Sequence, residues 1–199
     1  MSPDVKAFIE NNIALLEAHE FDTFYEKAQQ EFKYPQVHEL AISLEFAGIH
    51  SLDNMTFIPE GYFMYSSAID DYTVPKNIVR ICFKAFYVSD LRVIRTNNVI
   101  ELDYQAFGHC YMLTDVILDE GMQFIQDCAF EDCEELNNVI IPKSLEGFGH
   151  NVFYGCSNLT ELRYKGTISE WNKIRNHEFV QEGGSYISKI ICSDGIIEL

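Results

Sequence analysis

The chain has 199 residues, and 47% of them are apolar, which is enough for a sizeable buried core. Its 14 Lys and Arg residues face 31 Asp and Glu residues, a formal net charge of -17. This balance argues against nucleic acid as a direct ligand, because phosphate binding needs a basic face. No apolar run approaches the roughly 20 residues that cross a bilayer, and Asp4, Lys6 and Glu10 interrupt the stretch where a signal peptide would be apolar. We therefore expect a soluble, cytoplasmic protein with no membrane partner.

Residues 1–52 predict a helical subdomain. Ser2-Pro3 is typical of a helix start. The apolar residues on one face of this first helix are Val5, Phe8, Ile9, Ile13 and Leu16.

Two further short helices are expected in the same subdomain. The second opens at Asp22 or Thr23 and stops at Pro35. The third ends at Gly48, a favourable C-cap residue. Its apolar face is formed by Val37, Leu40, Ala41 and Leu44.

From residue 57 onward the sequence repeats itself. The anchors of the repeat are Phe63, Phe86, Phe107, Phe130 and Phe153, separated by 23, 21, 23 and 23 residues. Eight and five residues before the last four anchors lie apolar residues: Ile78 and Ile81, Val99 and Leu102, Met122 and Ile125, Leu145 and Phe148. A unit of this length cannot bury its own apolar face, so neighbouring units must stack. The period therefore predicts a solenoid.

Each unit also carries a short strand-like run about ten residues after its anchor, as in 72–74, 116–118, 139–141 and 162–164. Stacking these runs gives a narrow parallel sheet, with Val139 and Ile141 inward and Asn138 and Ile140 outward. The unit anchored at Phe86 is two residues short. A bulge there is one interpretation, and we assign no outward positions to it.

The repeated unit AF-x-x-C-x-x-L-x-x-V-x-I-P, preceded by V-x-x-I, resembles the BspA-like leucine-rich repeats over roughly residues 57 to 199. The segments TELRYKGTISEWNKI at 160–174 and IICSDGIIEL at 190–199 are similar to segments that end many such arrays. Val152 in place of Ala and Ser89 in place of Cys depart from the pattern.

This resemblance implies an α+β solenoid, a leucine-rich-repeat array of short stacked parallel strands. Residues 1–52 would be its helical amino-terminal cap, and 53–199 the repeats with a carboxy-terminal capping segment. The cap would cover the apolar first rung. A recognition role for the helices is the alternative.

The sequence offers little for catalysis or metal binding. The six histidines lack zinc-site spacing: His19, His38, His50, His109, His150 and His177. Cys110, Cys133 and Cys156 share one repeat position and are expected to be small buried thiols rather than disulfide partners. His109 could activate Cys110 only if both faced one cleft, and alternation directs them apart. We expect no enzyme activity, cofactor or metal.

Two surface features remain as candidates. Strand alternation places six residues on an outward face that we predict to bind a partner: Asp115, Ile117, Asn138, Ile140, Glu161 and Arg163. Asp71 and Thr73 extend this face. Ile117 and Ile140 would be adjacent, as in the apolar centre of an interface with a polar rim. The alternative is that a loop or the helical cap covers them.

The second feature is an acidic cluster, formed by Asp127, Glu131, Asp132, Glu134 and Glu135. It is opposite in sign to a basic group of the preceding units, formed by Lys76, Arg80, Lys84, Arg92 and Arg95. Such a cluster is either an ordinary solvated face or a surface that steers a basic partner.

These features predict a non-enzymatic module that binds another protein in the cytoplasm. Small intracellular versions of the family resemble proteins encoded by bacteriophages, which suggests a viral effector that inhibits a host defence or nucleic-acid-processing complex. Two alternatives stay open. The acidic cluster could imitate nucleic acid and inhibit a DNA- or RNA-binding enzyme, or the chain could be a structural component that self-associates.

Overall fold

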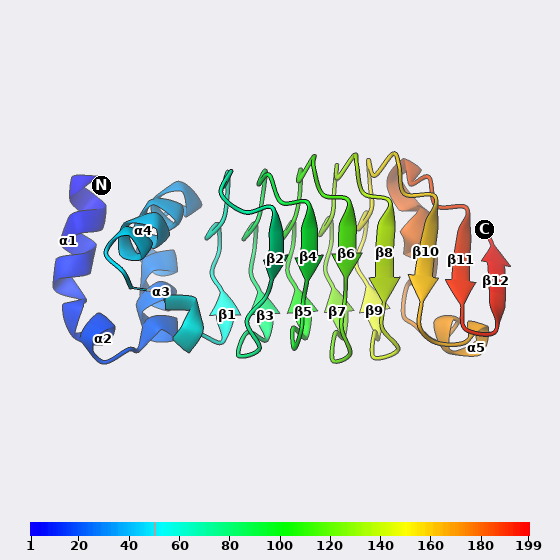
Figure 1. Ribbon diagram of the computed structural model, residues 1–199, viewed down its shortest axis with the longest axis horizontal. Helices are drawn as coiled ribbons and strands as arrows, with labels where there is room; N and C mark the ends of the chain where they lie inside the picture. Colours follow the sequence, from blue (N-terminus) through cyan, green and yellow to red (C-terminus); the bar gives the residue numbers. More distant parts are fainter. Residues whose placement is uncertain (50) are drawn as a thin grey trace.

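A computed structural model describes residues 1–49 and 51–199, so His50 lies outside the described residues. Four helices open the chain: α1 (Pro3–Asn11), α2 (Ile13–Glu17), α3 (Phe21–Glu31) and α4 (Tyr34–Phe46). They lie together at one end of an elongated array of coils (Figure 1). The predicted helix start is confirmed, because Val5 donates its backbone N–H to Ser2 Oγ at 3.5 Å.

Two predicted helix bounds are wrong. The first helix breaks at Asn12, whose side-chain nitrogen donates to the Phe8 carbonyl at 3.0 Å and competes with the helical ladder. Pro35 does not stop a helix, since it lies in the first turn of α4, where its missing N–H has no helical partner to lose. Gly48 follows α4 with φ +76°, the left-handed conformation expected of a C-cap residue.

The chain forms two sheets that face each other across the core (Figure 1). Their strands are parallel except for β12, the last strand of the front sheet. The front sheet has seven strands: β2 (Asp71–Thr73), β4 (Val93–Arg95), β6 (Asp115–Ile117), β8 (Asn138–Ile141), β10 (Glu161–Tyr164), β11 (Lys189–Cys192) and β12 (Gly195–Glu198). The back sheet has five: β1 (Phe57–Ile58), β3 (Arg80–Ile81), β5 (Glu101–Leu102), β7 (Phe124–Ile125) and β9 (Gly147–Phe148). The predicted solenoid of stacked parallel strands is confirmed, and the back sheet is an addition to it.

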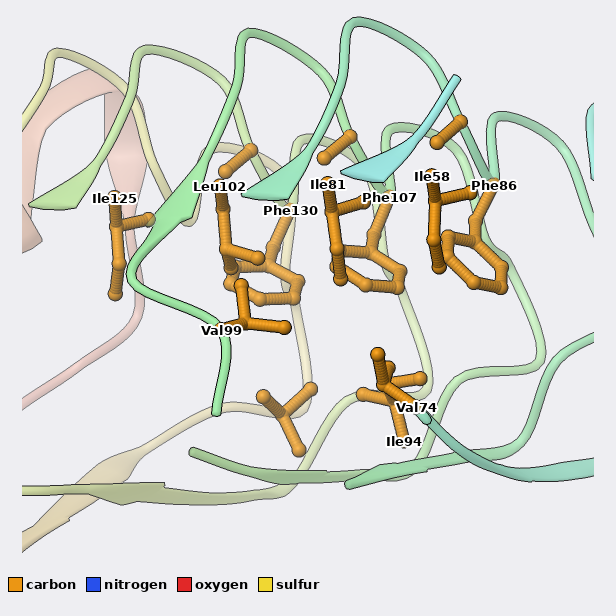
Figure 2. Packing of buried hydrophobic residues seen from close by; sticks show 14 of the residues in the cluster. Ile58, Val74, Ile81, Phe86, Ile94, Val99, Leu102, Phe107, Ile125 and Phe130 are labelled. Atoms are coloured by element: carbon orange, nitrogen blue, oxygen red, sulfur yellow. The ribbon is translucent and has the colours of Figure 1, made fainter. Parts of the chain in front are cut away.

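A continuous stack of phenylalanine rings runs along the solenoid axis. Successive anchor rings lie 4.8, 4.9, 5.2 and 5.7 Å apart from Phe63 to Phe153, with interplanar angles that fall from 25° to 7°. Figure 2 shows three of these rings, Phe86, Phe107 and Phe130, beside the aliphatic residues of the back-sheet strands. Offset stacking adds to the burial of each ring. The predicted aromatic spine is thus the centre of the core.

Turns around each anchor tie one coil to the next. The residues two before and two after each anchor adopt positive φ, as at Gln105 and His109 beside Phe107. His109 donates its N–H to Glu131 of the next coil at 2.7 Å, and the equivalent bond recurs at Asp132. The repeated cysteines also bridge coils, since the Cys133 thiol donates to the Phe107 carbonyl at 3.2 Å. Backbone groups that leave the sheets therefore remain paired.

The short unit contains no bulge in its strand. Val93–Arg95 pairs in register with Asp71–Thr73 on one side and Asp115–Ile117 on the other. The missing residues are divided between two connections, one before β4 and one between β4 and β5. Thr96, fully buried in the second connection, accepts the N–H of Asp119 at 3.1 Å. Loop shortening leaves the strand register unchanged.

Both ends of the array are covered. At the amino-terminal end, Asp22 of α3 accepts both the N–H of Thr56, at 2.9 Å, and its hydroxyl, at 2.6 Å. Ser51, which opens the 3₁₀ helix η1 (Ser51–Asn54), lies 2.9 Å from the Tyr62 hydroxyl. The Tyr62 ring in turn contacts Phe63 at 4.8 Å. The helices thus rest on the first coil.

At the other end, α5 (Ile168–Trp171) begins with a capping box formed by Thr167 and Glu170. Trp171 is 1% exposed and lies 5.8 Å from the Phe148 ring. The 3₁₀ helix η2 (His177–Gly184) follows, and its Phe179 stacks on His150 at 4.3 Å. The strands β11 and β12 then form an antiparallel hairpin that ends the front sheet.

Removal of one ring from the spine should be far more costly than removal of a ring outside it. Phe107→Ala is expected to lower the free energy of unfolding by about 3–5 kcal/mol, because the fully buried ring loses stacking partners on both faces. Phe83→Ala is the matched control, since Phe83 is half-buried and stacks on Tyr104 outside the spine. Guanidinium denaturation measures both. Equal losses would contradict the central role of the spine.

Candidate functional site

The outer face of the front sheet carries two rows of side chains in register. The polar row is Asp71, Val93, Asp115, Asn138, Glu161, Lys189 and Glu198. The isoleucine row is Thr73, Arg95, Ile117, Ile140, Arg163, Ile191 and Ile196. All six predicted partner-binding residues lie in these rows, within three consecutive strands. The geometry therefore brings them together on one surface.

The two central isoleucines are direct neighbours. Ile117 pairs with Ile140 in the parallel register, and both are half-buried, whereas Val116 and Val139 beneath them are 0% and 1% exposed. The alternation used to predict outward positions therefore holds for β6 and β8. Part of each isoleucine side chain remains open to solvent.

Polar side chains beside the isoleucines are held by short hydrogen bonds. Asn138 donates its side-chain N–H to Asp115 at 2.7 Å, and Thr114 donates its hydroxyl to the other oxygen of Asp115 at 2.8 Å. Next to them, the Lys189 ammonium lies 3.1 Å from the Glu161 carboxylate. The Arg163 guanidinium lies 3.5 Å from the other oxygen of the same carboxylate. The pKa of the Glu161 carboxyl is lowered, mainly because Lys189 donates a hydrogen bond to it. Glu161 is therefore ionised at neutral pH.

Six members of these rows were not predicted: Val93, Arg95, Lys189, Ile191, Ile196 and Glu198. Arg95 lies next to Ile117 and makes a 2.5 Å ion pair with Asp71. The short unit hid both Arg95 and Val93, because their outward direction could not be assigned from the period. Ile191 and Ile196 belong to a hairpin outside the repeat, so only the two β-branched runs on either side of the turn at Ser193 and Asp194 could have signalled them.

The predicted acidic cluster follows one coil from the back sheet to the front sheet. Asp127 lies just after β7, and Glu134 and Glu135 lie just before β8. Several of its members make contacts to neighbouring coils: Asp127 accepts the N–H of His150 at 2.7 Å, and Asp132 lies 3.3 Å from His109. Glu131 accepts a side-chain hydrogen bond from Gln105, and Glu135 accepts one from Asn158 at 3.2 Å. These carboxylates thus hold coils together as well as face solvent.

The three arginines of the predicted basic group are in ion pairs with nearby carboxylates. Arg80 lies 2.9 Å from Asp103, Arg92 lies 3.6 Å from Asp70, and Arg95 pairs with Asp71. The Lys84 ammonium lies over the Tyr87 ring at 4.3 Å. Much of the basic charge is therefore compensated locally.

The repeat-position thiols are buried, as predicted. The Cys110 thiol is 0% exposed, donates to the Phe86 carbonyl at 3.0 Å, and burial raises its pKa to about 11. His109 is directed instead toward Asp132 and Tyr111, whose hydroxyl lies 3.2 Å from its ring nitrogen. His109 and Cys110 therefore do not form a thiol–imidazole pair. Within residues 1–49 and 51–199, no three side chains of His, Cys, Asp or Glu gather as metal ligands.

A pocket of about 530 Å³ lies between α4 and the first coil. Its lining includes His38 and Ile42 of the helix and Tyr65 and Ile69 of the coil. His38 Nδ1 is 2.8 Å from the Tyr62 carbonyl, which fixes the helix to the coil. No sequence pattern indicates this pocket, because it forms between two elements with different periods.

Short parallel strands stacked in coils around an apolar spine define a leucine-rich-repeat solenoid. A family model described as BspA type Leucine rich repeat region matches residues 56–183 in six copies, and the chain belongs to this family. Among curated proteins, none matches the chain significantly.

Two solved structures are similar. A leucine-rich-repeat protein of T. pallidum, TpLRR, is 22% identical with a TM-score of 0.53, over 55% of this chain and 52% of that one. A leucine rich cell surface protein from Faecalibacterium prausnitzii A2-165 is 26% identical with a TM-score of 0.53, over 61% of this chain and 33% of that one. This chain thus matches about half of the first protein and a third of the second. In the described part of the chain, none of the helices combines the length and apolarity required to span a bilayer.

Burial makes a specific prediction for cysteine chemistry. In the native protein at pH 8, Cys110 and Cys133 should resist iodoacetamide, because both are 0% exposed and burial raises the pKa of each thiol. Half-exposed Cys128 should react first and serves as the internal comparison. Peptide mapping by mass spectrometry measures each site, with full labelling in guanidinium as the control. Rapid labelling of Cys110 in the native protein would contradict this prediction and would indicate an activated thiol at this position.

The ion pairs of Glu161 predict a pH-dependent stability. Since the folded-state pKa is lowered from its ordinary value of 4.5, the stabilisation is present above that pH and is lost as the pH falls through the folded-state pKa. Glu161→Gln should cost less than about 1 kcal/mol at pH 7, and the difference from wild type should shrink in acid. The matched control is Glu134→Gln, at an exposed carboxylate. Denaturation at several pH values measures both, and a pH-independent difference would contradict the ion pairs.

Proposed function

We propose that the chain is a protein-recognition module that binds its partner through the outer face of the front sheet and catalyses no reaction. The observation that carries this proposal is the pairing of Ile117 with Ile140 at the centre of a polar surface. An apolar centre surrounded by polar groups is the usual composition of a protein interface.

The groups around the isoleucines indicate what the partner offers. Arg95 and Arg163 stand at the two ends of the Ile117–Ile140 pair in the same row. Asp115 and Asn138 lie beside it in the polar row. A complementary surface would present an apolar side chain to the isoleucines, carboxylates to the arginines, and hydrogen-bond donors to Asp115. Such mixed polarity favours a folded protein surface over a nucleic acid or a uniformly basic peptide.

The short strands also suit this role physically. The register fixes where each side chain projects, and the β-branched Ile117 and Ile140 have few rotamers to lose when a partner covers them. The hydrogen bonds of Asn138 and Thr114 to Asp115 fix the polar groups in advance. A preorganised surface of this kind can bind without rearrangement of its backbone.

A finer form of the proposal concerns the target. We propose that the target is a host defence or nucleic-acid-processing complex in the cytoplasm, and that this chain, of bacteriophage origin, inhibits the complex by occupying one of its surfaces. The net charge of -17 supports this proposal, because it would attract a complex that has a basic surface. Imitation of nucleic acid by the acidic cluster remains a separate prediction.

The test is to capture partners with the tagged wild-type chain and with a double variant that carries Ile117→Asp and Ile140→Asp. A partner that binds through the isoleucine row should be lost, because two carboxylates would be buried at its centre. Ile100→Asp is the matched control, since Ile100 is 39% exposed and precedes β5 of the back sheet. Circular dichroism confirms that each variant folds.

Quantitative mass spectrometry of the captured proteins compares the two variants with wild type. A partner retained by Ile100→Asp and lost from the double variant supports the proposal. Retention of every partner by a folded double variant would contradict it. Purified partner and chain then give the affinity and its salt dependence directly.

A further inference from the structure

None of the described strands pairs with the outer edge of β12, the last strand of the front sheet. In the hairpin of β11 and β12, Leu199 donates its N–H to Ser188 at 2.8 Å, so Ser188 and Leu199 form a hydrogen-bonded pair. Since such pairs alternate along an antiparallel ladder, Ile190 with Ile197 and Cys192 with Gly195 are also hydrogen-bonded pairs. The backbone N–H and C=O groups of Ile196 and Glu198 therefore point away from β11.

This edge has little protection. The sheet order places β12 at one end, with β11 as its only neighbour among the described strands (Figure 1). The helix α5 lies against the turn end of the strand, where a Cβ on Gly195 would be 3.1 Å from Ile168. Natural edge strands are often protected by Pro, by a bulge or by charged side chains, especially Lys, and the strand GIIE has neither Pro nor Lys and carries one charged residue, Glu198, at its end. Ile196 is 55% exposed on this edge strand.

Charge along the chain favours close approach of two molecules at this end. Residues 101–150 carry 1 basic and 11 acidic groups, whereas residues 151–199 carry 5 basic and 6 acidic groups. The block that contains the hairpin therefore has a net charge of -1, against -10 for the block that contains the acidic cluster, so two copies repel each other less at the hairpin than at the cluster. A second copy is thus an electrostatically acceptable occupant of this edge despite the net charge.

We propose that β12 pairs with β12 of a second copy in antiparallel orientation, so that two front sheets become one continuous sheet. A two-fold axis beside Ile197 sets Ile197 of one copy opposite Ile197 of the other. Ile196 then forms a hydrogen-bonded pair with Glu198 of the second copy, and the symmetric pair forms on the other side. Every outward N–H and C=O of Ile196 and Glu198 gains a partner.

The edge of β12 is self-complementary, so a second copy can pair with it. The outward groups occur on alternate residues around Ile197, so a two-fold axis satisfies all of them at once. In this register the two Glu198 carboxylates are not opposite each other, because each faces Ile196. The isoleucine row of each copy continues toward the contact through Ile191 and Ile196.

Sedimentation velocity over a series from micromolar to millimolar concentration tests the pairing. Wild type should dimerise reversibly. Ile196→Pro should weaken dimerisation at least tenfold, because proline removes an outward N–H that has no partner within the hairpin. The matched control Ile196→Val keeps the N–H and should still dimerise. A wild type that remains monomeric throughout, or an undiminished dimer of Ile196→Pro, would overturn the proposal.

A second variant keeps the proposal testable if proline disrupts the hairpin. Ile197→Cys places two thiols across the axis at a non-hydrogen-bonded pair, where opposed Cα atoms are close enough for a disulfide. Mild oxidation should give a covalent dimer, whereas Glu198→Cys and wild type, which retain the same six native cysteines, should not. Dimers of Glu198→Cys without dimers of Ile197→Cys would refute this register.

Discussion

The stacking of five phenylalanine rings is the interaction on which the rest of the structure depends. The rings fix the spacing of the coils, and this spacing allows both parallel sheets to pair. It also brings each cysteine thiol within reach of the preceding phenylalanine carbonyl, as for Cys156 and Phe130 at 3.0 Å. The front sheet inherits its register from the same stack, so the surface pairing of Ile117 with Ile140 is a consequence of ring packing in the core.

A stack of this kind needs two different ends. The first coil has Tyr62 where later coils have Ala85 or Ala106, and its larger ring reaches the helices, contacting Tyr25 at 5.6 Å. The last coil instead meets Trp171, whose ring lies 5.4 Å from Tyr164. Each end thus replaces the missing neighbouring coil with an aromatic side chain from a non-repeating element. The hairpin extends the front sheet by two strands, and none of the described strands pairs with the outer edge of β12.

Much of the fold could be predicted from sequence, because the spine has a period. Phe107 and Phe130 recur with their neighbours at fixed offsets, and this identifies the solenoid without any knowledge of contacts. The back sheet was missed because strands of two residues, such as Glu101–Leu102, are too short to show alternation. The break at Asn12 was missed because it depends on one local side-chain hydrogen bond. On the surface, alternation located Ile117 and Ile140, but Arg95 and Ile196 lie where the period is shortened or absent. The role of these four residues in binding remains a prediction.

The undisturbed register of β4 shows where the array tolerates changes in chain length. One residue is missing from each of two connections, yet Ile94 still aligns with Tyr72 and Val116. Each coil therefore behaves as an exchangeable unit whose corners absorb insertions and deletions while its flat sides stay constant. Evolution can lengthen or shorten such a protein by whole coils, and so adjust the reach of its surface without redesigning the core.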